Sequence, residues 1–95
     1  MPLTQEHLDQ AVAIARRYGA DRVLLFGSAL RNPETAQDLD LAVGGVDGWD
    51  FFGMAAEMEE TLPVPLDVIA LTPENAFIRH IRARGRWLFD TPPLK

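Results

Sequence analysis

The residues of this sequence best placed to do chemistry are three aspartates. Asp38 and Asp40 are separated by a single leucine, and Asp67 follows inside another apolar segment. Residues two apart on a strand point to the same face, so Asp38 and Asp40 should lie together if residues 38–43 form a strand. Two ionised carboxylates at that distance repel each other, and a divalent cation between them relieves the repulsion. Oxygen ligands without a neighbouring His or Cys favour Mg²⁺ or Mn²⁺ over zinc.

Asp67 is the third carboxylate of this candidate set. The rest of segment 66–71 is apolar, which predicts a buried strand. An unpaired charge in a buried strand is costly, so we expect Asp67 either to be paired or to serve the same metal site. Three carboxylates beside bound phosphates would allow two-metal, in-line phosphoryl displacement.

A glycine-containing turn precedes the aspartate pair. The apolar run 22–26 predicts a buried strand that ends at Gly27, with Ser28 next and a spacer of nine residues before Asp38. Glycine allows a sharp turn and the close approach of a ligand. If residues 29–31 begin a helical turn, its free N–H groups and the Ser28 hydroxyl would form an anion site. Triphosphate oxygens are natural occupants of such a site.

Three helices are expected to support these segments. Thr4 is a suitable N-cap for a first helix that Gly19 should end, and Pro63 should close a second helix over residues 49–62. The third should start with Thr72 as cap and Pro73 at its first position, and should end at Gly85. The apolar residues that indicate the second helix are Phe52, Ala55, Ala56 and Leu62. The expected buried side of the third is formed by Phe77, Ile78 and Ile81.

The order of segments predicts one compact α/β layer structure, with residues 87–89 as a short final strand or packing segment. We expect a single domain over residues 1–95, with a small mixed β-sheet flanked by helices. A domain of this size gains stability from a bound ligand or from a homo- or hetero-oligomeric partner.

Composition excludes several functional classes. The chain has no cysteine, so disulfides and thiolate–metal sites are excluded. No signal peptide or membrane span is recognisable, and a cytoplasmic protein is expected. The net charge of −5 disfavours a nucleic acid as acceptor, because phosphate-bound polynucleotides usually meet a basic surface.

The combined motif resembles the nucleotidyltransferase superfamily of DNA polymerase beta. Its signature is a hydrophobic residue, Gly, Gly or Ser, a spacer, and then an Asp-hydrophobic-Asp/Glu-hydrophobic pair followed by a later Asp. Phe26-Gly27-Ser28, Asp38-Leu39-Asp40-Leu41 and Asp67 match it in order, and the resemblance covers nearly the whole chain. Short proteins of this build are the minimal nucleotidyltransferases, many of which are antitoxins of helical HEPN ribonuclease toxins.

This resemblance implies a role for each matched residue. Asp38 and Asp40 would hold the Mg²⁺ ions, two by this scheme, that bridge the triphosphate of ATP. Asp67 would bind the catalytic metal and help to deprotonate the acceptor hydroxyl. Gly27 and Ser28 would hold the β and γ phosphates, and Arg31, which matches a common arginine three residues after the serine, would neutralise phosphate charge.

The motif departs from the family pattern after Arg31 and before Asp38. Asn32-Pro33 follows the arginine where many members have glycine, and Gln37 stands where Ser is frequent. Asn can adopt left-handed geometry, which would preserve the turn. We expect these departures to affect triphosphate geometry and turnover more than metal binding.

The resemblance implies transfer of AMP from ATP to a hydroxyl of a partner protein, with a HEPN toxin as that partner. One alternative is a non-catalytic antitoxin that neutralises its partner by binding alone. Another is transfer to a small molecule of the aminoglycoside type, which so short a chain has little wall to enclose.

Other conspicuous side chains have simpler interpretations. His7 and His80 lack ligand spacing and are expected at the surface. The arginines of the C-terminal part fit a solvated helix face better than an anion-binding surface; they are Arg79, Arg82, Arg84 and Arg86. Three aromatic residues are expected in the core or an interface rather than as a base-stacking platform, although one could be exposed for a partner; they are Trp49, Phe51 and Phe52.

Overall fold

Helices and strands alternate along the chain. The structure is a computed structural model that describes residues 3–32, 35–36 and 38–91. In chain order the elements are α1 (Gln5–Arg17), β1 (Arg22–Phe26), α2 (Ser28–Arg31), β2 (Leu39–Gly44), α3 (Gly48–Thr61), β3 (Leu66–Ala70), α4 (Ala76–Arg84) and β4 (Arg86–Asp90).

The strands form one mixed sheet in the order β3-β2-β1-β4. The central strand β1 is antiparallel to both β2 and β4, whereas β2 and β3 are parallel. The parallel pair is joined through α3, as a crossover connection requires. The expected small mixed sheet flanked by helices is confirmed, and segment 87–89 is part of a fourth strand.

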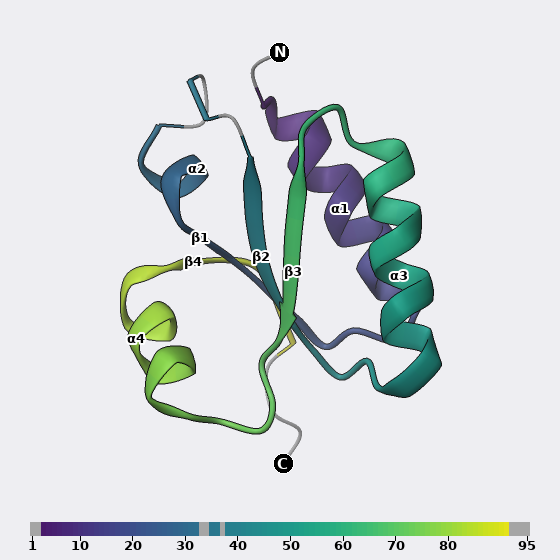
Figure 1. Cartoon of the computed structure of the whole chain (residues 1–95), viewed down its shortest axis with the longest axis vertical. Coiled ribbons are helices and arrows are strands. Elements are labelled where there is room, and N and C mark those ends of the chain that lie inside the picture. Colours follow the sequence, from purple (N-terminus) through teal and green to yellow (C-terminus); the bar gives the residue numbers. More distant parts are fainter. Residues whose placement is uncertain (1–2, 33–34, 37, 92–95) are drawn as a thin grey trace.

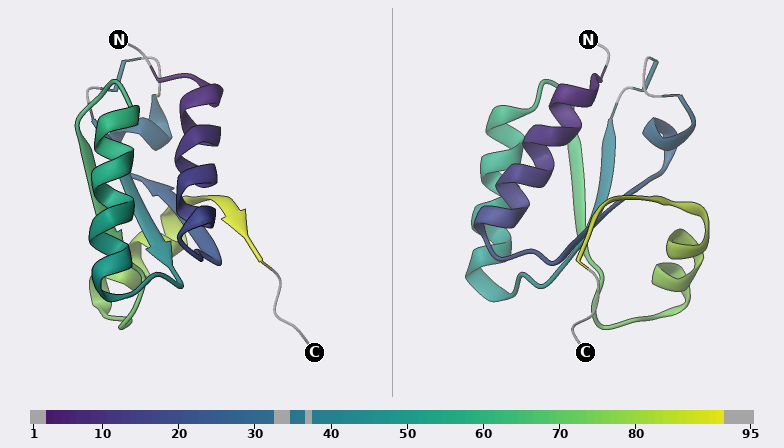
Figure 2. Two further views of the ribbon diagram at one scale, coloured as in Figure 1. Left: turned by 90° about the vertical axis from the view of Figure 1, so that its right-hand side faces the viewer. Right: turned by 180° about the vertical axis from the view of Figure 1, so that it is seen from behind.

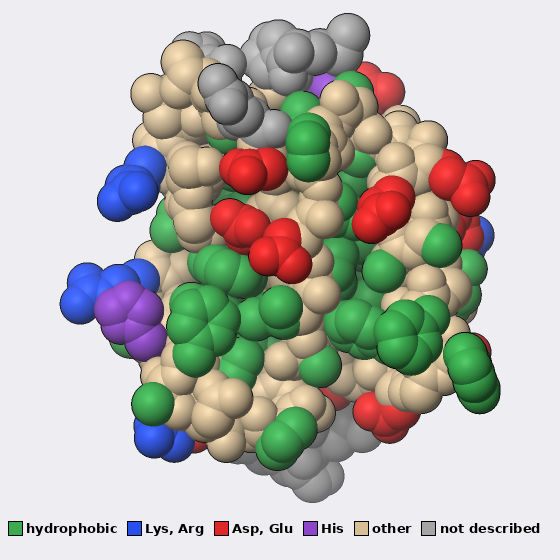
Figure 3. Space-filling model, in the orientation of Figure 1, with side chains coloured by type: hydrophobic (Ala, Val, Ile, Leu, Met, Phe, Trp, Pro, Cys, Tyr) green, Lys and Arg blue, Asp and Glu red, His purple; other side chains and the backbone are tan. Residues whose placement is uncertain are grey.

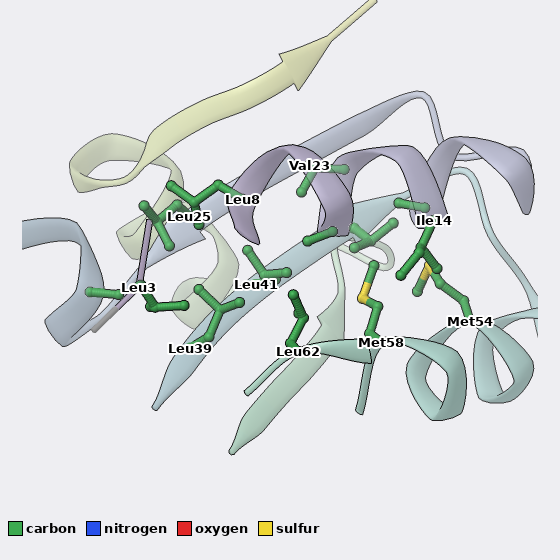
Figure 4. Close-up of a cluster of buried hydrophobic side chains, with 14 of the residues drawn as sticks. Leu3, Leu8, Ile14, Val23, Leu25, Leu39, Leu41, Met54, Met58 and Leu62 are labelled. Carbon is green, nitrogen blue, oxygen red and sulfur yellow. The ribbon is translucent and has the colours of Figure 1, made fainter. Parts of the chain in front are cut away.

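Helices cover both faces of the sheet. Helices α1 and α3 lie side by side on one face, and α4 lies over the opposite face (Figures 1 and 2). The strand alternation divides the core accordingly: Leu39, Leu41 and Val43 pack toward α1 and α3 (Figure 4), whereas Ala42 packs with α4. Asp40 alternates with the leucines, so it lies on the opposite face of β2, the one toward α4.

The first helix begins where the sequence predicts. The Thr4 side chain accepts a hydrogen bond from the His7 backbone N–H, and the Thr4 N–H donates to His7 Nδ1, which completes a capping box. The helix ends at Arg17, with Gly19 just beyond it at φ +94°. Leu8, Ile14 and Ala15 are buried against the sheet.

The predicted start of the last helix is wrong. Helix α4 is capped by Asn75 instead of Thr72, because the Asn75 side-chain oxygen accepts a hydrogen bond of 2.8 Å from the Ile78 N–H. Pro73 therefore lies before the helix. Ile78 and Ile81 are buried as expected, and Gly85 is the C-cap, but Phe77 is 53% exposed.

The apolar residues that indicated α3 divide between the core and the surface: Leu62 is buried and Ala55 is partly buried. Met54 and Met58 are completely buried, whereas Phe52 is 67% exposed and Ala56 is exposed. The sequence pattern was ambiguous because apolar residues occur on several sides of this helix. The unbranched Met side chains fill the space between α1 and α3 beside Ile14 (Figure 4).

No helix in the described part of the chain is long and apolar enough to cross a membrane.

Candidate active site

The sheet register brings Asp40 and Asp67 next to each other. They are directly opposed on the parallel strands β2 and β3. Adjacent strands are about 4.8 Å apart, and opposed residues of a parallel pair point to the same face. A cluster of acidic side chains is visible near the centre of the face shown in Figure 3. The predicted meeting of these two carboxylates on one face is therefore present in the fold.

Asp38 lies one residue before β2 instead of within the strand, which corrects the predicted start at residue 38. It nevertheless remains part of the cluster. The Ser28 hydroxyl donates to Asp38 Oδ1 at 3.5 Å, and the negative charge of Asp38 acts on Asp40. The Gly-Ser turn and the first carboxylate are thus linked by direct contact.

The surroundings of Asp40 disfavour its ionised form. Burial raises the pKa of Asp40 above its ordinary value, and the charges of Asp38 and Asp67 raise it further. Like charges disfavour one another's ionised forms. In the described part of the chain, none of the three forms an ion pair with a basic side chain. The negative charge of this cluster is therefore not neutralised by a neighbouring basic side chain among the described residues.

The burial argument for Asp67 is wrong, although its position is as expected. Strand β3 is an edge strand, and Asp67 is exposed between partly buried neighbours. Desolvation therefore does not require Asp67 to have a partner. What associates it with the site is its register opposite Asp40.

The turn after β1 depends on Gly27. Its φ of +80° lies in a region that side-chain-bearing residues rarely adopt, and a Cβ at this position would collide with the Asp40 carboxylate. Glycine thus allows β1 to end directly against the acidic cluster. Residues 28–31 form the expected helical turn, α2.

The expected left-handed geometry of Asn32 is wrong. Asn32 has φ −151° and ψ 76°, so the chain leaves α2 in an extended conformation. The other two departures from the family motif, Pro33 and Gln37, lie outside the described residues.

The donor atoms of the cluster suit a hard cation, but they do not yet form a coordination shell. Within residues 3–32, 35–36 and 38–91, no group of three or more His, Asp or Glu side chains could hold a metal ion in the present conformation. All donors are carboxylate oxygens, the type that Mg²⁺ prefers. Asp38 and Asp67 are exposed, so rotation of their side chains toward Asp40 meets little steric resistance. The residues present therefore fit Mg²⁺ in chemistry and location.

Two pockets of about 440 Å³ each flank α2, and Arg31 lines both. One, the α2–β2 pocket, also contains Ser28 and Asp38. The other, the α2–α4 pocket, contains Gly27 and is closed on its far side by Phe77 and His80 of α4. The motif residues 27, 28 and 31 thus form the N-cap and the two ends of α2, and each lines at least one of these pockets. The contribution of α4 was missed from the sequence, because its pocket residues match no motif.

The three aromatic residues at the start of α3 differ in exposure. Trp49 is 87% exposed and its ring centroid lies 5.9 Å from that of Phe52, so neither lies in the core, and the expected interface role of this pair stays a prediction. Phe51 is partly buried against the core. The exposed pair lies at the start of α3, on the helical layer opposite the carboxylate face.

The comparisons with known proteins place this fold among the minimal nucleotidyltransferases. No protein-family model matches the chain, and no curated protein matches it. Among solved structures, a protein assigned as a minimal nucleotidyltransferase is 26% identical, with 95% of this chain and 91% of that one covered and a TM-score of 0.67. The chain therefore has the minimal nucleotidyltransferase fold, as its motif predicts.

Toxin–antitoxin complexes are also among the similar structures. One contains a tri-AMPylated HEPN toxin of Shewanella oneidensis with its MNT antitoxin; it is 19% identical over 94% of this chain and 74% of that one, with a TM-score of 0.73. Another toxin–antitoxin structure, which contains AMP-PNP, is 19% identical over 88% and 73% of the two chains, also with a TM-score of 0.73. At these identities the similarity establishes the shared fold.

Proposed function

We propose that this chain is a nucleotidyltransferase that transfers AMP from ATP to a hydroxyl of a partner protein, and that it is the antitoxin of a HEPN toxin. The observation that carries the proposal is the meeting of Asp38, Asp40 and Asp67 beside the Gly27-Ser28 turn. Similar folds occur in an AMP-PNP complex and in a complex with an AMPylated toxin, which supports this choice of substrate and partner.

The residues suggest a division of labour for the transfer. The acceptor oxygen forms a bond to the α phosphorus, the bond from that phosphorus to the α–β bridging oxygen breaks, and its electron pair leaves with pyrophosphate. Asp67, the exposed carboxylate at the sheet edge, takes the acceptor proton. Ser28, Gly27 and Arg31 orient the β and γ phosphates for in-line displacement.

Mg²⁺ would be held by Asp38, Asp40 and Asp67. When bound, it supplies positive charge that offsets both the triphosphate charge and the mutual repulsion of these carboxylates. Burial is the larger cause of the raised pKa of Asp40, and the charges of Asp38 and Asp67 raise it further, which supports this repulsion. The negative charge of the acidic cluster is therefore complementary to the positive charge of a phosphate-bound metal.

A transfer assay tests the proposal. The chain is incubated with Mg²⁺, ATP and a candidate helical HEPN protein, sought first in the neighbouring reading frame, and the intact mass of that protein is measured. We expect its mass to increase by one or more AMP units. The double variant Asp38→Asn/Asp40→Asn should abolish the increase, because its amides retain the shape but lose the charge that binds the metal.

Asp90→Asn is the matched control. Asp90 is also exposed and lies opposite Arg22 at the far end of β1, away from Phe26 and Asp40. This variant should transfer AMP like the parent chain. The outcome that contradicts the enzymatic proposal is full neutralisation of the toxin by the double variant, which would favour inhibition by binding alone.

A further inference from the structure

The α2–α4 pocket combines an apolar wall with basic side chains. Phe26 and Phe77 meet edge to face in its wall, with ring centroids 6.0 Å apart. Its volume of about 440 Å³ lies within the roughly 300–1,000 Å³ of typical ligand sites. Arg31, His80 and Arg84 add basic groups from both helices, and no acidic side chain lines the pocket among the described residues.

The arginines of α4 fall into two groups. Arg79 and Arg82 both pair with Glu74, at 3.8 Å and 2.7 Å, so they share one negative charge. Arg84 forms no ion pair within the described part of the chain, and it lies one helical turn after His80 on the pocket side. The sequence-based interpretation of one solvated arginine face therefore applies to the first group only.

Arg84 also orients His80. Its Nε donates to His80 Nδ1 at 3.5 Å, so the neutral imidazole carries its proton on Nε2. That N–H and the remaining guanidinium N–H groups are donors for an anion. A guanidinium on a chain of net charge −5 also creates a local positive region on an otherwise acidic molecule. Figure 3 shows basic and histidine side chains together at one edge of the carboxylate face.

The position of the pocket indicates which anion it receives. Gly27 and Arg31 are two of the three residues that the proposed function assigns to the β and γ phosphates, and they line this pocket, while Ser28 lines the adjacent α2–β2 pocket. We infer that His80 and Arg84 of α4 act with Arg31 to bind the pyrophosphate portion of the nucleoside triphosphate. The inference rests on the proposed function and deepens it, because it adds two binding residues that lie outside the sequence motif.

Calorimetric titrations with ATP, AMP and inorganic pyrophosphate, each with Mg²⁺, test this assignment. Arg84→Gln should weaken the binding of ATP and pyrophosphate about tenfold, since a charge-assisted hydrogen bond is lost, and leave AMP unchanged. Arg79→Gln is the matched control, because it removes the same charge from the same helix on the face that pairs with Glu74. It should change all three affinities by less than about twofold.

Three results would overturn the inference: equal pyrophosphate affinity in the two variants, equal weakening of AMP and ATP by Arg84→Gln, or a parent chain that binds neither ATP nor pyrophosphate. Failure of the proposed function is distinguishable from these. If Arg84→Gln selectively weakens pyrophosphate binding but the parent chain transfers no AMP to its partner, the pocket assignment holds and the proposed transfer does not.

Discussion

At the scale of single residues, the contact between Gly27 and Asp40 connects the phosphate turn to the acidic cluster. Gly27 has φ +80° and abuts the Asp40 carboxylate, which is itself partly buried near two other carboxylates. Neither residue can change without affecting the other. A side chain at position 27 should therefore lower both stability and nucleotide binding, whereas loss of the Asp40 charge should raise stability and lower nucleotide binding.

The first prediction concerns Gly27→Ala. The new methyl group would both strain the backbone and displace the Asp40 carboxylate, so we expect a loss of about 1–3 kcal/mol in unfolding free energy and a loss of ATP binding. Gly19→Ala is the control: its φ is +94°, yet its Cβ would meet nothing within 4 Å. It should cost backbone strain alone and keep ATP affinity. Equal ATP affinity in the two variants would contradict the assigned contact.

The second prediction concerns Asp40→Asn in the presence of a chelator. The folded-state pKa of Asp40 is raised by burial and by Asp38 and Asp67, so its ionised form destabilises the fold above that pKa. The amide should therefore raise the Tm at neutral pH. The gain should shrink as the pH falls through the raised folded-state pKa and disappear below the unfolded-state pKa of about 3.9, where both states are protonated. A variant less stable than the parent at neutral pH would refute the repulsion.

At the scale of elements, the sequence predicted the strands better than the helix faces. The runs before Gly27 and around Asp40 identify β1 and β2, because their apolar residues alternate or run continuously between glycines. The exposure of Phe52 could not be predicted because helix α3 has apolar residues on several sides, and only tertiary packing decides which side is buried. Likewise, Thr72 and Asn75 are both residue types that commonly cap helices, so the local sequence could not show that Asn75 caps α4.

The site shows the same division between local and long-range information. The motif gave the identities of Asp38, Asp40 and Asp67, but the direct opposition of Asp40 and Asp67 depends on strand register. The exposure of Asp67 follows from the edge position of β3, which no local pattern reveals. His80 and Arg84 reach the pocket only because α4 crosses the sheet beside α2.

The third prediction concerns the polar link between α1 and α3. Glu57 of α3 accepts hydrogen bonds from Arg17 and from the Tyr18 hydroxyl. These bonds lower the pKa of Glu57, with Arg17 the larger cause, and the bond to Glu57 raises the pKa of Tyr18. The stabilisation should be present above the ordinary Glu pKa of about 4.3 and be lost as the pH falls through the lowered value.

Tyr18 is the one tyrosine of the sequence, so its ultraviolet titration reports this link directly. Glu57→Gln should lower the Tyr18 pKa toward the ordinary value of about 10 and lower the Tm slightly, with the Tm difference shrinking at high salt. Glu60→Gln removes the same charge from an exposed position on the same helix and should leave Tyr18 unchanged. A Tyr18 titration that is identical in the parent chain and Glu57→Gln would disprove the link.

At the scale of the whole molecule, small size and excess negative charge make stability dependent on ligands. The chain has 95 residues, a net charge of −5 and a cluster of like charges at the end of its central strands. A free nucleotide is repelled by such a surface, whereas a nucleotide bound with Mg²⁺ carries the cation that the cluster lacks. Mg²⁺ and ATP should therefore bind interdependently, each weakening strongly when the other is absent.

The fourth prediction follows from that interdependence. At a Mg–ATP concentration of about 100 times the Kd, linkage should add about 2.7 kcal/mol to the unfolding free energy. For a domain of this size, that corresponds to a rise in Tm of roughly 10–20 °C. ATP with a chelator, or Mg²⁺ alone, should give a much smaller rise. Asp40→Asn should abolish the rise in Tm that Mg–ATP causes, because the Asp40 carboxylate binds the cation. The Tm of this variant without ligand should nevertheless be higher than that of the parent chain, because the same carboxylate destabilises the ligand-free fold. If Mg–ATP raised the Tm of Asp40→Asn and the parent chain equally, the nucleotide would be binding away from the acidic cluster.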